Sequence, residues 1–242
     1  MKNSQKFYLF LIMVAACNNT TPTTVTGGCN NLVLFHKGAV VESSSYDAKG
    51  KETSKQTATV TDVVQAGGFT ESHVKNVMHM PSLGDKTAEV VYKCDGKNLY
   101  VDVNSVMQNF KALQNTNAKV SNMGLPLDVS EGQKLPDVVA SFTMTMGGKP
   151  MEIVTTYKDR TVGAKENITT PAGSFKCYKI SSTTDADVQG ADEKMKAAMN
   201  SMKGKMKAKM IMWYAPDVGI VKTETYSNDA LAAYTQVTSI KK

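Results

Sequence analysis

Short runs of alternating apolar and polar residues recur along most of this chain, and turns rich in glycine, proline or asparagine separate them. The pattern is fullest near the C-terminus, where the turn 171–173 precedes the run 174–180 and the turn 215–219 leads into the run 218–226. A period of two is typical of strands that bury one face. We therefore expect antiparallel strands at 32–35, 39–46, 52–64, 69–80, 86–93, 98–103, 138–146, 151–158, 162–168, 174–180, 206–214, 218–226 and 231–240.

Two segments show a helical period instead. Val106, Phe110 and Leu113 are spaced for one helical face, which predicts a short helix over 105–115. A stripe of methionines with lysines around it predicts a second helix over about 191–203, ending before Gly204. Its members are Met195, Met199, Met202, Met206 and Met210. The expected fold is mainly β (α+β): a curved antiparallel sheet with one or two short helices packed on or over it.

The N-terminus has the organisation of an export signal. Lys2 and Lys6 precede an apolar run over 7–16, which ends in small residues before Cys17. The sequence Val-Ala-Ala-Cys resembles a bacterial lipobox, so we expect residues 1–16 to be removed and Cys17 to carry acyl chains. The alternative is an ordinary secretory signal. Residues 17–28 are rich in asparagine, threonine and glycine, which predicts a flexible tether before a single domain over 29–242.

The composition narrows the class of protein. It is globular, with 41% hydrophobic and 21% charged residues, and the formal net charge is +6. Two of the lysines lie in the segment expected to be removed, and the remaining positive charge is concentrated between Lys194 and Lys209. This distribution does not form a nucleic-acid-binding field, so we expect no nucleic-acid partner.

Three cysteines remain after Cys17, namely Cys29, Cys94 and Cys177. An oxidising compartment favours one disulfide and one free thiol, and three pairings are possible. We favour Cys29–Cys94, because Cys29 follows the tether and a bond there would fix the start of the fold to the strands.

Several motifs together resemble the TapB-type family of bacterial envelope proteins, within a larger set of envelope domains of unknown function. They are 170–180, 213–222, 37–38, 46–51, 93–96 and 238–242, so the resemblance covers most of 29–242. It implies a half-barrel similar to the LolA- and LolB-like lipoprotein carriers. It brings no catalytic residue.

A half-barrel with an apolar concave face would hold a hydrophobic ligand, with a helix as a lid. Met195, Met199, Met202 and Met206 suit such a lid, because methionine packs against variable apolar shapes. Two alternatives stay open. These methionines pack the helix onto the sheet, or the Lys/Met helix lies on an anionic membrane beside the anchor.

Metal binding and catalysis have less support. Met78, His79 and Met80 form a compact group of soft ligands for copper, but on a strand His79 faces away from the two methionines. None of the three histidines lies in a hydrolase or metalloprotease signature. Cys177 follows Lys176 in an expected strand, which favours a buried or bridged cysteine over a nucleophile.

We therefore expect a non-catalytic lipoprotein anchored in the bacterial envelope, in the outer membrane and facing the periplasm, without metal or cofactor. Its partners would be the membrane, through the anchor, and an apolar ligand (lipid or acyl chain) or an envelope protein. A scaffold with no small ligand is the alternative, and a copper-binding protein is a weaker one.

Overall fold

The computed structural model describes residues 27–81, 84–102, 105, 118–121, 124–146, 149–189 and 208–242. Within these residues the chain is almost entirely β-structure. The strands run over Val40–Asp47 (β1), Glu52–Ala66 (β2), Phe69–Met80 (β3), Gly84–Cys94 (β4), Asn98–Val101 (β5), Ala118–Ser121 (β6), Leu125–Pro126 (β7), Val138–Met146 (β8), Lys149–Thr170 (β9), Gly173–Gln189 (β10), Ala208–Ala215 (β11), Gly219–Ser227 (β12) and Ala230–Lys241 (β13).

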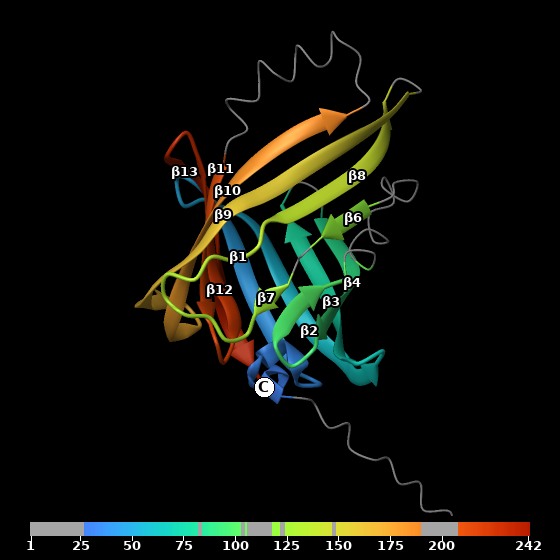
Figure 1. Ribbon diagram of the computed structural model, residues 1–242. Coiled ribbons are helices and arrows are strands. Elements are labelled where there is room, and N and C mark those ends of the chain that lie inside the picture. The colour runs from blue at the N-terminus through green and yellow to red at the C-terminus, as the bar shows by residue number, and fades with distance from the viewer. Residues whose placement is uncertain are drawn as a thin grey trace, which may run out of the picture.

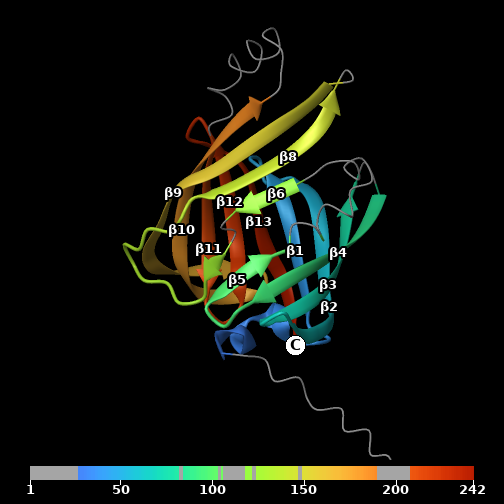
Figure 2. The same ribbon diagram turned by 45° about the vertical axis from the view of Figure 1, so that its right-hand side comes forward.

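These strands form one curved antiparallel sheet in the order β6-β8-β9-β10-β11-β12-β13-β1-β2-β3-β4-β5-β7 (Figure 1). Strands β1 to β5 and β8 to β13 each follow one another as neighbours, and β13 pairs with β1 to join the two series. The sheet curls round without closing, with β6 at one end and β7 at the other (Figure 2). The predicted fold class is confirmed.

The turns account for much of this topology. Asn228 and Asp229 link β12 to β13 with φ values of 50° and 61°. A two-residue hairpin turn of this kind needs positive φ at both central positions, and asparagine and aspartate tolerate it. The twist of the turn then matches the twist of the strands, so local chemistry specifies the pairing.

The predicted strand at 32–35 is wrong. The chain forms two 3-10 helices, η1 (Gly27–Asn31) and η2 (Val33–Phe35). Leu32, Val33 and Phe35 are all buried, and an isolated strand would send alternate side chains to opposite faces. The segment lies at one end of the half-barrel (Figure 1), where a tight coil buries these neighbouring side chains together in the core.

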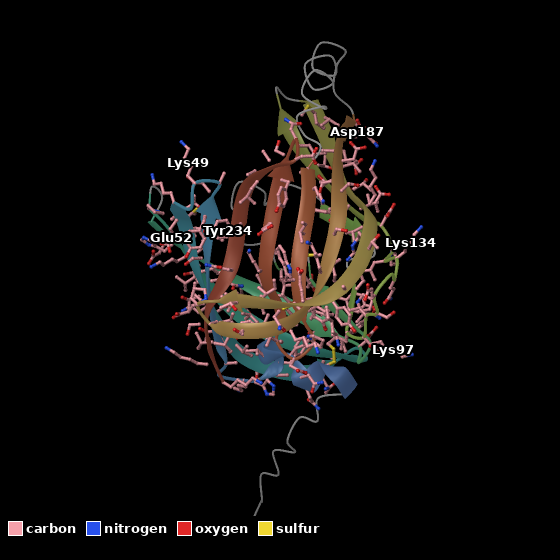
Figure 3. All side chains as sticks on the ribbon, turned by 90° about the vertical axis from the view of Figure 1, so that its left-hand side faces the viewer. Lys49, Glu52, Lys97, Lys134, Asp187 and Tyr234 are labelled. Carbon is pink, nitrogen blue, oxygen red and sulfur yellow. A yellow bond between two sulfur atoms is a disulfide. The ribbon has the colours of Figure 1, made fainter. Side chains whose placement is uncertain are left out.

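The β9–β10 hairpin is longer than the sequence predicts. The predicted strands 151–158 and 162–168 are one strand, β9, with an irregularity where Asp159 adopts a φ of 55°. Strand β10 continues past 180 to Gln189. The end of the hairpin at the turn between β9 and β10 crosses the outside of β11 to β13 in Figure 3. Strand β9 also contacts β13, although the two strands are not paired.

Several predictions lie outside the described residues. They are the helix over 191–203 and, apart from Ser105, the helix over 105–115, together with the signal segment 1–16 and most of the tether 17–28. In the part of the chain that the structure describes, no helix is long and apolar enough to cross a membrane.

The strand registers assign side chains to the two faces of the sheet, because residues directly opposite each other share a face. Val33 of η2 packs with Val60 and Val74, which are opposite each other on β2 and β3. We call this side, towards η2, the concave face, and the other side the outer face.

Candidate binding site

The concave face holds a pocket beside η2, which we call the concave pocket. Its floor is apolar and contains Leu34, Val41, Ala58, Tyr92 and Val237. The hydroxyl group of Ser72 donates a hydrogen bond to the backbone carbonyl of Leu34, which fixes η2 against the sheet. The 3-10 helix at the end of the half-barrel therefore contributes Leu34 to the floor, and the other four residues come from strands.

Polar side chains line the same pocket. Ser43 lies opposite Gln56 on β1 and β2, and Thr223 lies opposite Thr235 on β12 and β13, all four on the concave face. The amide nitrogen of Gln56 donates to the side-chain oxygen of Asn76 at 2.7 Å. We call Ser43, Gln56, Thr223 and Thr235 the polar rim.

The concave pocket is small. Its volume is about 150 Å³, whereas pockets for drug-sized ligands have about 300–1,000 Å³. A cavity of about 150 Å³ lined by apolar groups holds one benzene ring. The pocket is therefore large enough for one ring or a short alkyl segment.

The polar lining extends to β10. Ser182 shares the concave face with Ile180 and is 3% exposed, and its hydroxyl group has no hydrogen-bond partner among the described residues. A buried hydroxyl without a partner is uncommon in folded proteins. The concave face thus carries polar groups beside the apolar ones that the sequence predicts.

The outer face carries an aromatic and charged cluster. Trp213 of β11 donates from its indole nitrogen to Glu166 of β9. The Nζ atoms of Lys222 and Lys179 lie 4.9 Å and 5.7 Å from the centre of the Trp213 ring. Lys222 also pairs with Glu224 at 2.7 Å, which together with the hydrogen bond from Tyr226 lowers the pKa of that carboxyl group against the effect of its burial. These contacts join the β9–β10 hairpin to the sheet.

Cys29 and Cys94 form the disulfide, the pairing that the sequence favoured, and their Cα atoms are 6.0 Å apart. Both are fully buried in a core cluster with Leu32, Phe35 and Tyr214. Cys177 is a buried free thiol. Burial raises its pKa to about 11, and the nearby charge of Glu166 acts in the same direction. A thiol with so high a pKa is protonated at neutral pH, whereas the thiolate is the nucleophilic form.

The raised pKa of Cys177 predicts weaker folding in alkaline solution. The thiol of an unfolded chain has a pKa of about 8.5, so the folded protein holds the proton more tightly. This contribution to stability is complete below about pH 8.5 and is lost as the pH rises towards about 11. Urea titrations from pH 8 upward should show the decline, and Cys177→Ala should remove part of it. A variant whose decline is as steep as that of the wild type would contradict this assignment.

The predicted site residues are only partly within the described chain. Cys17 and the proposed lid residues Met195, Met199, Met202 and Met206 lie outside it. Met78 shares the concave face, because it lies opposite Gln56. His79 lies on the outer face with its Nδ1 2.6 Å from Asp85. The three neighbours 78–80 therefore do not converge on one metal ion.

The described residues contain no group of three or more histidine, cysteine, aspartate or glutamate side chains placed to hold a metal ion. His73 pairs with Glu89 at 3.2 Å, so this histidine, like His79, makes a cross-strand contact with a carboxylate on the surface.

Sequence reasoning missed the polar rim. Its residues are small and polar, and such residues on strands are usually assigned to the solvent face. A signal was present, because Gln56 is in step with Ala58 and Val60 of the same alternating run. That alternation places Gln56 on the buried side.

The comparisons with known proteins agree on the fold. A family model described as DUF3108-like matches residues 36–237. A protein of Bacteroides fragilis, described as exported and with a YmcC-like fold, is 22% identical at a TM-score of 0.60, over 86% of this chain and 97% of its own. A protein of Parabacteroides distasonis, described as a lipoprotein, is 20% identical at a TM-score of 0.64, over 90% and 100%. No protein with a curated description matches.

These findings support the coarser part of the predicted resemblance. The family model covers most of the range over which the motifs resemble TapB-type proteins, but its name is a different one. The TapB-like assignment stays a prediction. The two solved structures are less than 25% identical to this chain, so they establish the half-barrel architecture and not an activity.

Proposed function

This chain belongs to the DUF3108-like family, and we propose that it is an exported envelope lipoprotein that binds the apolar end of an amphipathic molecule without catalysis. The observation that carries the proposal is the concave pocket, with its apolar floor and polar rim. Ligand sites combine an apolar lining with a few polar groups that fix orientation. An amphipathic molecule matches both parts.

The size of the pocket limits how much of an acyl chain it can enclose. A volume of about 150 Å³ takes about one ring or a short alkyl segment. The rest of the ligand then lies along the polar part of the concave face or in solvent. The methionine lid remains a prediction about residues outside the described chain.

Export and anchoring rest on separate observations. The N-terminal segment ending at Cys17 resembles a lipoprotein signal, and the two solved structures are described as an exported protein and a lipoprotein. A buried disulfide suits an oxidising compartment. We propose that the acylated Cys17 holds the domain at the outer membrane, on the periplasmic side.

Filling the concave pocket tests the binding function. Ala58 lines the floor and is 8% exposed, so Ala58→Leu places a larger side chain in the space for the ligand. We expect hexyl β-glucoside to bind the purified wild-type protein and to bind this variant at least about ten-fold more weakly, because the alkyl group loses its apolar contacts. Isothermal titration calorimetry measures both affinities.

Thr59→Leu is the matched control, because Thr59 is the next residue on β2 and faces the outer side. It should bind hexyl β-glucoside as the wild type does. Thermal unfolding of each variant shows that the fold is retained. If the wild type binds no amphiphile with a hexyl or phenyl group, whatever its headgroup, or if Ala58→Leu binds hexyl β-glucoside equally well, the proposal fails and a scaffold without a small ligand becomes the better account.

A further inference from the structure

Among the described residues, Lys222 of β12 is the charged residue on the lining of the concave pocket, and its ammonium group is directed away from it. Its Nζ lies 2.7 Å from Glu224 and 4.9 Å from the centre of the Trp213 ring. Both partners belong to the outer face. The lysine charge is thus held on the opposite side of the sheet from the polar rim.

The groups that face the pocket are neutral in the described chain. Ser43, Thr223 and Thr235 contribute hydroxyl groups, and Gln56 contributes an amide. Tyr92 in the floor stays protonated, since burial raises the pKa of its hydroxyl group. Hydroxyl groups both donate and accept hydrogen bonds and rotate to suit the partner. The rim can therefore satisfy donors and acceptors of a neutral ligand together.

Among the residues that the structure describes, no opposite charge faces the rim to pair with an ionic group of a ligand. Moving an ion out of water without a counter-charge costs several kcal/mol, whereas a neutral hydroxyl group that finds a hydrogen-bond partner avoids most of its penalty. The net charge of the chain is +6, which alone would favour an anion. Lys222, on the strand beside the pocket, directs its charge to the outer face instead.

We infer, on the basis of the proposed function, that the polar part of the ligand is uncharged and rich in hydroxyl groups, as in a glycoside or a polyol ester. Amphiphiles whose headgroup is a phosphate, a sulfate or a quaternary ammonium are excluded as the preferred ligands. The selectivity comes from the neutral rim, and the affinity comes from the apolar floor.

Three compounds with the same apolar group test this selectivity. Phenyl β-glucoside, phenyl phosphate and phenyltrimethylammonium each carry one aromatic ring, the size that a pocket of about 150 Å³ accepts. We expect calorimetry on the wild-type protein to give at least about ten-fold tighter binding of the glucoside than of either ion. Equal or tighter binding of one of the ions overturns the inference.

The experiment separates this inference from the proposed function. Binding of the ions but not of the glucoside would leave a functioning pocket and overturn only the neutral headgroup. If no phenyl or hexyl compound binds, the proposed function fails, and this inference, which depends on it, fails as well.

A charge placed in the rim gives a second test. Gln56→Glu puts a carboxylate on the concave face, so binding of phenyltrimethylammonium should become at least about ten-fold tighter and binding of phenyl phosphate weaker. Thr59→Glu places the same charge on the outer face of β2, opposite Lys75 of β3. This control should leave the binding of all three compounds unchanged. An equal response in both variants would overturn the assignment of the rim.

Discussion

Replacing Cys29 and Cys94 together by alanine should lower the free energy of unfolding by about 4 kcal/mol. The disulfide closes a loop across 65 positions of the sequence, and a cross-link over a loop of that length removes much conformational freedom from the unfolded chain. It also ties η1, which precedes the sheet, to the end of β4. Urea denaturation followed by circular dichroism measures the loss.

The control for this prediction is Cys177→Ala. It removes a buried thiol without breaking a cross-link, so its effect reports packing alone. The double alanine variant should be clearly the less stable of the two. If it lost less than about 1 kcal/mol, the disulfide would contribute little to the fold and the entropic argument would be wrong here.

Trp213→Ala should lower the free energy of unfolding by about 3–5 kcal/mol. The side chain is 5% exposed and lies in the cluster that joins the β9–β10 hairpin to the outer face. Its removal leaves a cavity and deprives Glu166 of the indole donor and Lys222 of the aromatic ring. Chemical denaturation followed by circular dichroism measures the change.

Trp213→Phe separates the contributions at this site. It retains an aromatic ring for the lysines and loses the hydrogen bond to Glu166, which predicts a loss of about 1–3 kcal/mol. A loss equal to that of Trp213→Ala would mean that the hydrogen bond and not the packing dominates. If both variants kept the stability of the wild type, the hairpin would not be held by this residue.

The strands could be predicted from the sequence because two local signals, alternating polarity and turn residues, agree. Runs such as 52–64 and 218–226 alternate between apolar and polar residues. Turn residues separate successive runs, as Asn228 and Asp229 do after 218–226, where they adopt the positive φ that a tight hairpin requires. Each signal acts within a few residues, so no distant contact is needed to interpret it. These runs correspond to β2 and β12.

The candidate site was less accessible from the sequence. A polar residue such as Thr223 has the same appearance whether it faces solvent or a ligand, and its neighbour Thr235 is brought to it only by strand pairing. Leu34 enters the floor from a segment whose apolar run also suits a strand. The packing of the whole segment at the end of the half-barrel decides between coil and strand.

The sequence by itself determined the antiparallel strands, most of their turns and the expectation of export, because alternation, turn chemistry and a signal segment are local properties. Only the tertiary structure decided that β13 pairs with β1, that the β9–β10 hairpin crosses the outer face, and that an uncharged rim surrounds an apolar floor. The physical reason is that these features depend on the curvature of the sheet. Each strand is rotated slightly relative to its neighbour, and over many strands these rotations accumulate into a curved sheet that brings together residues far apart in the chain.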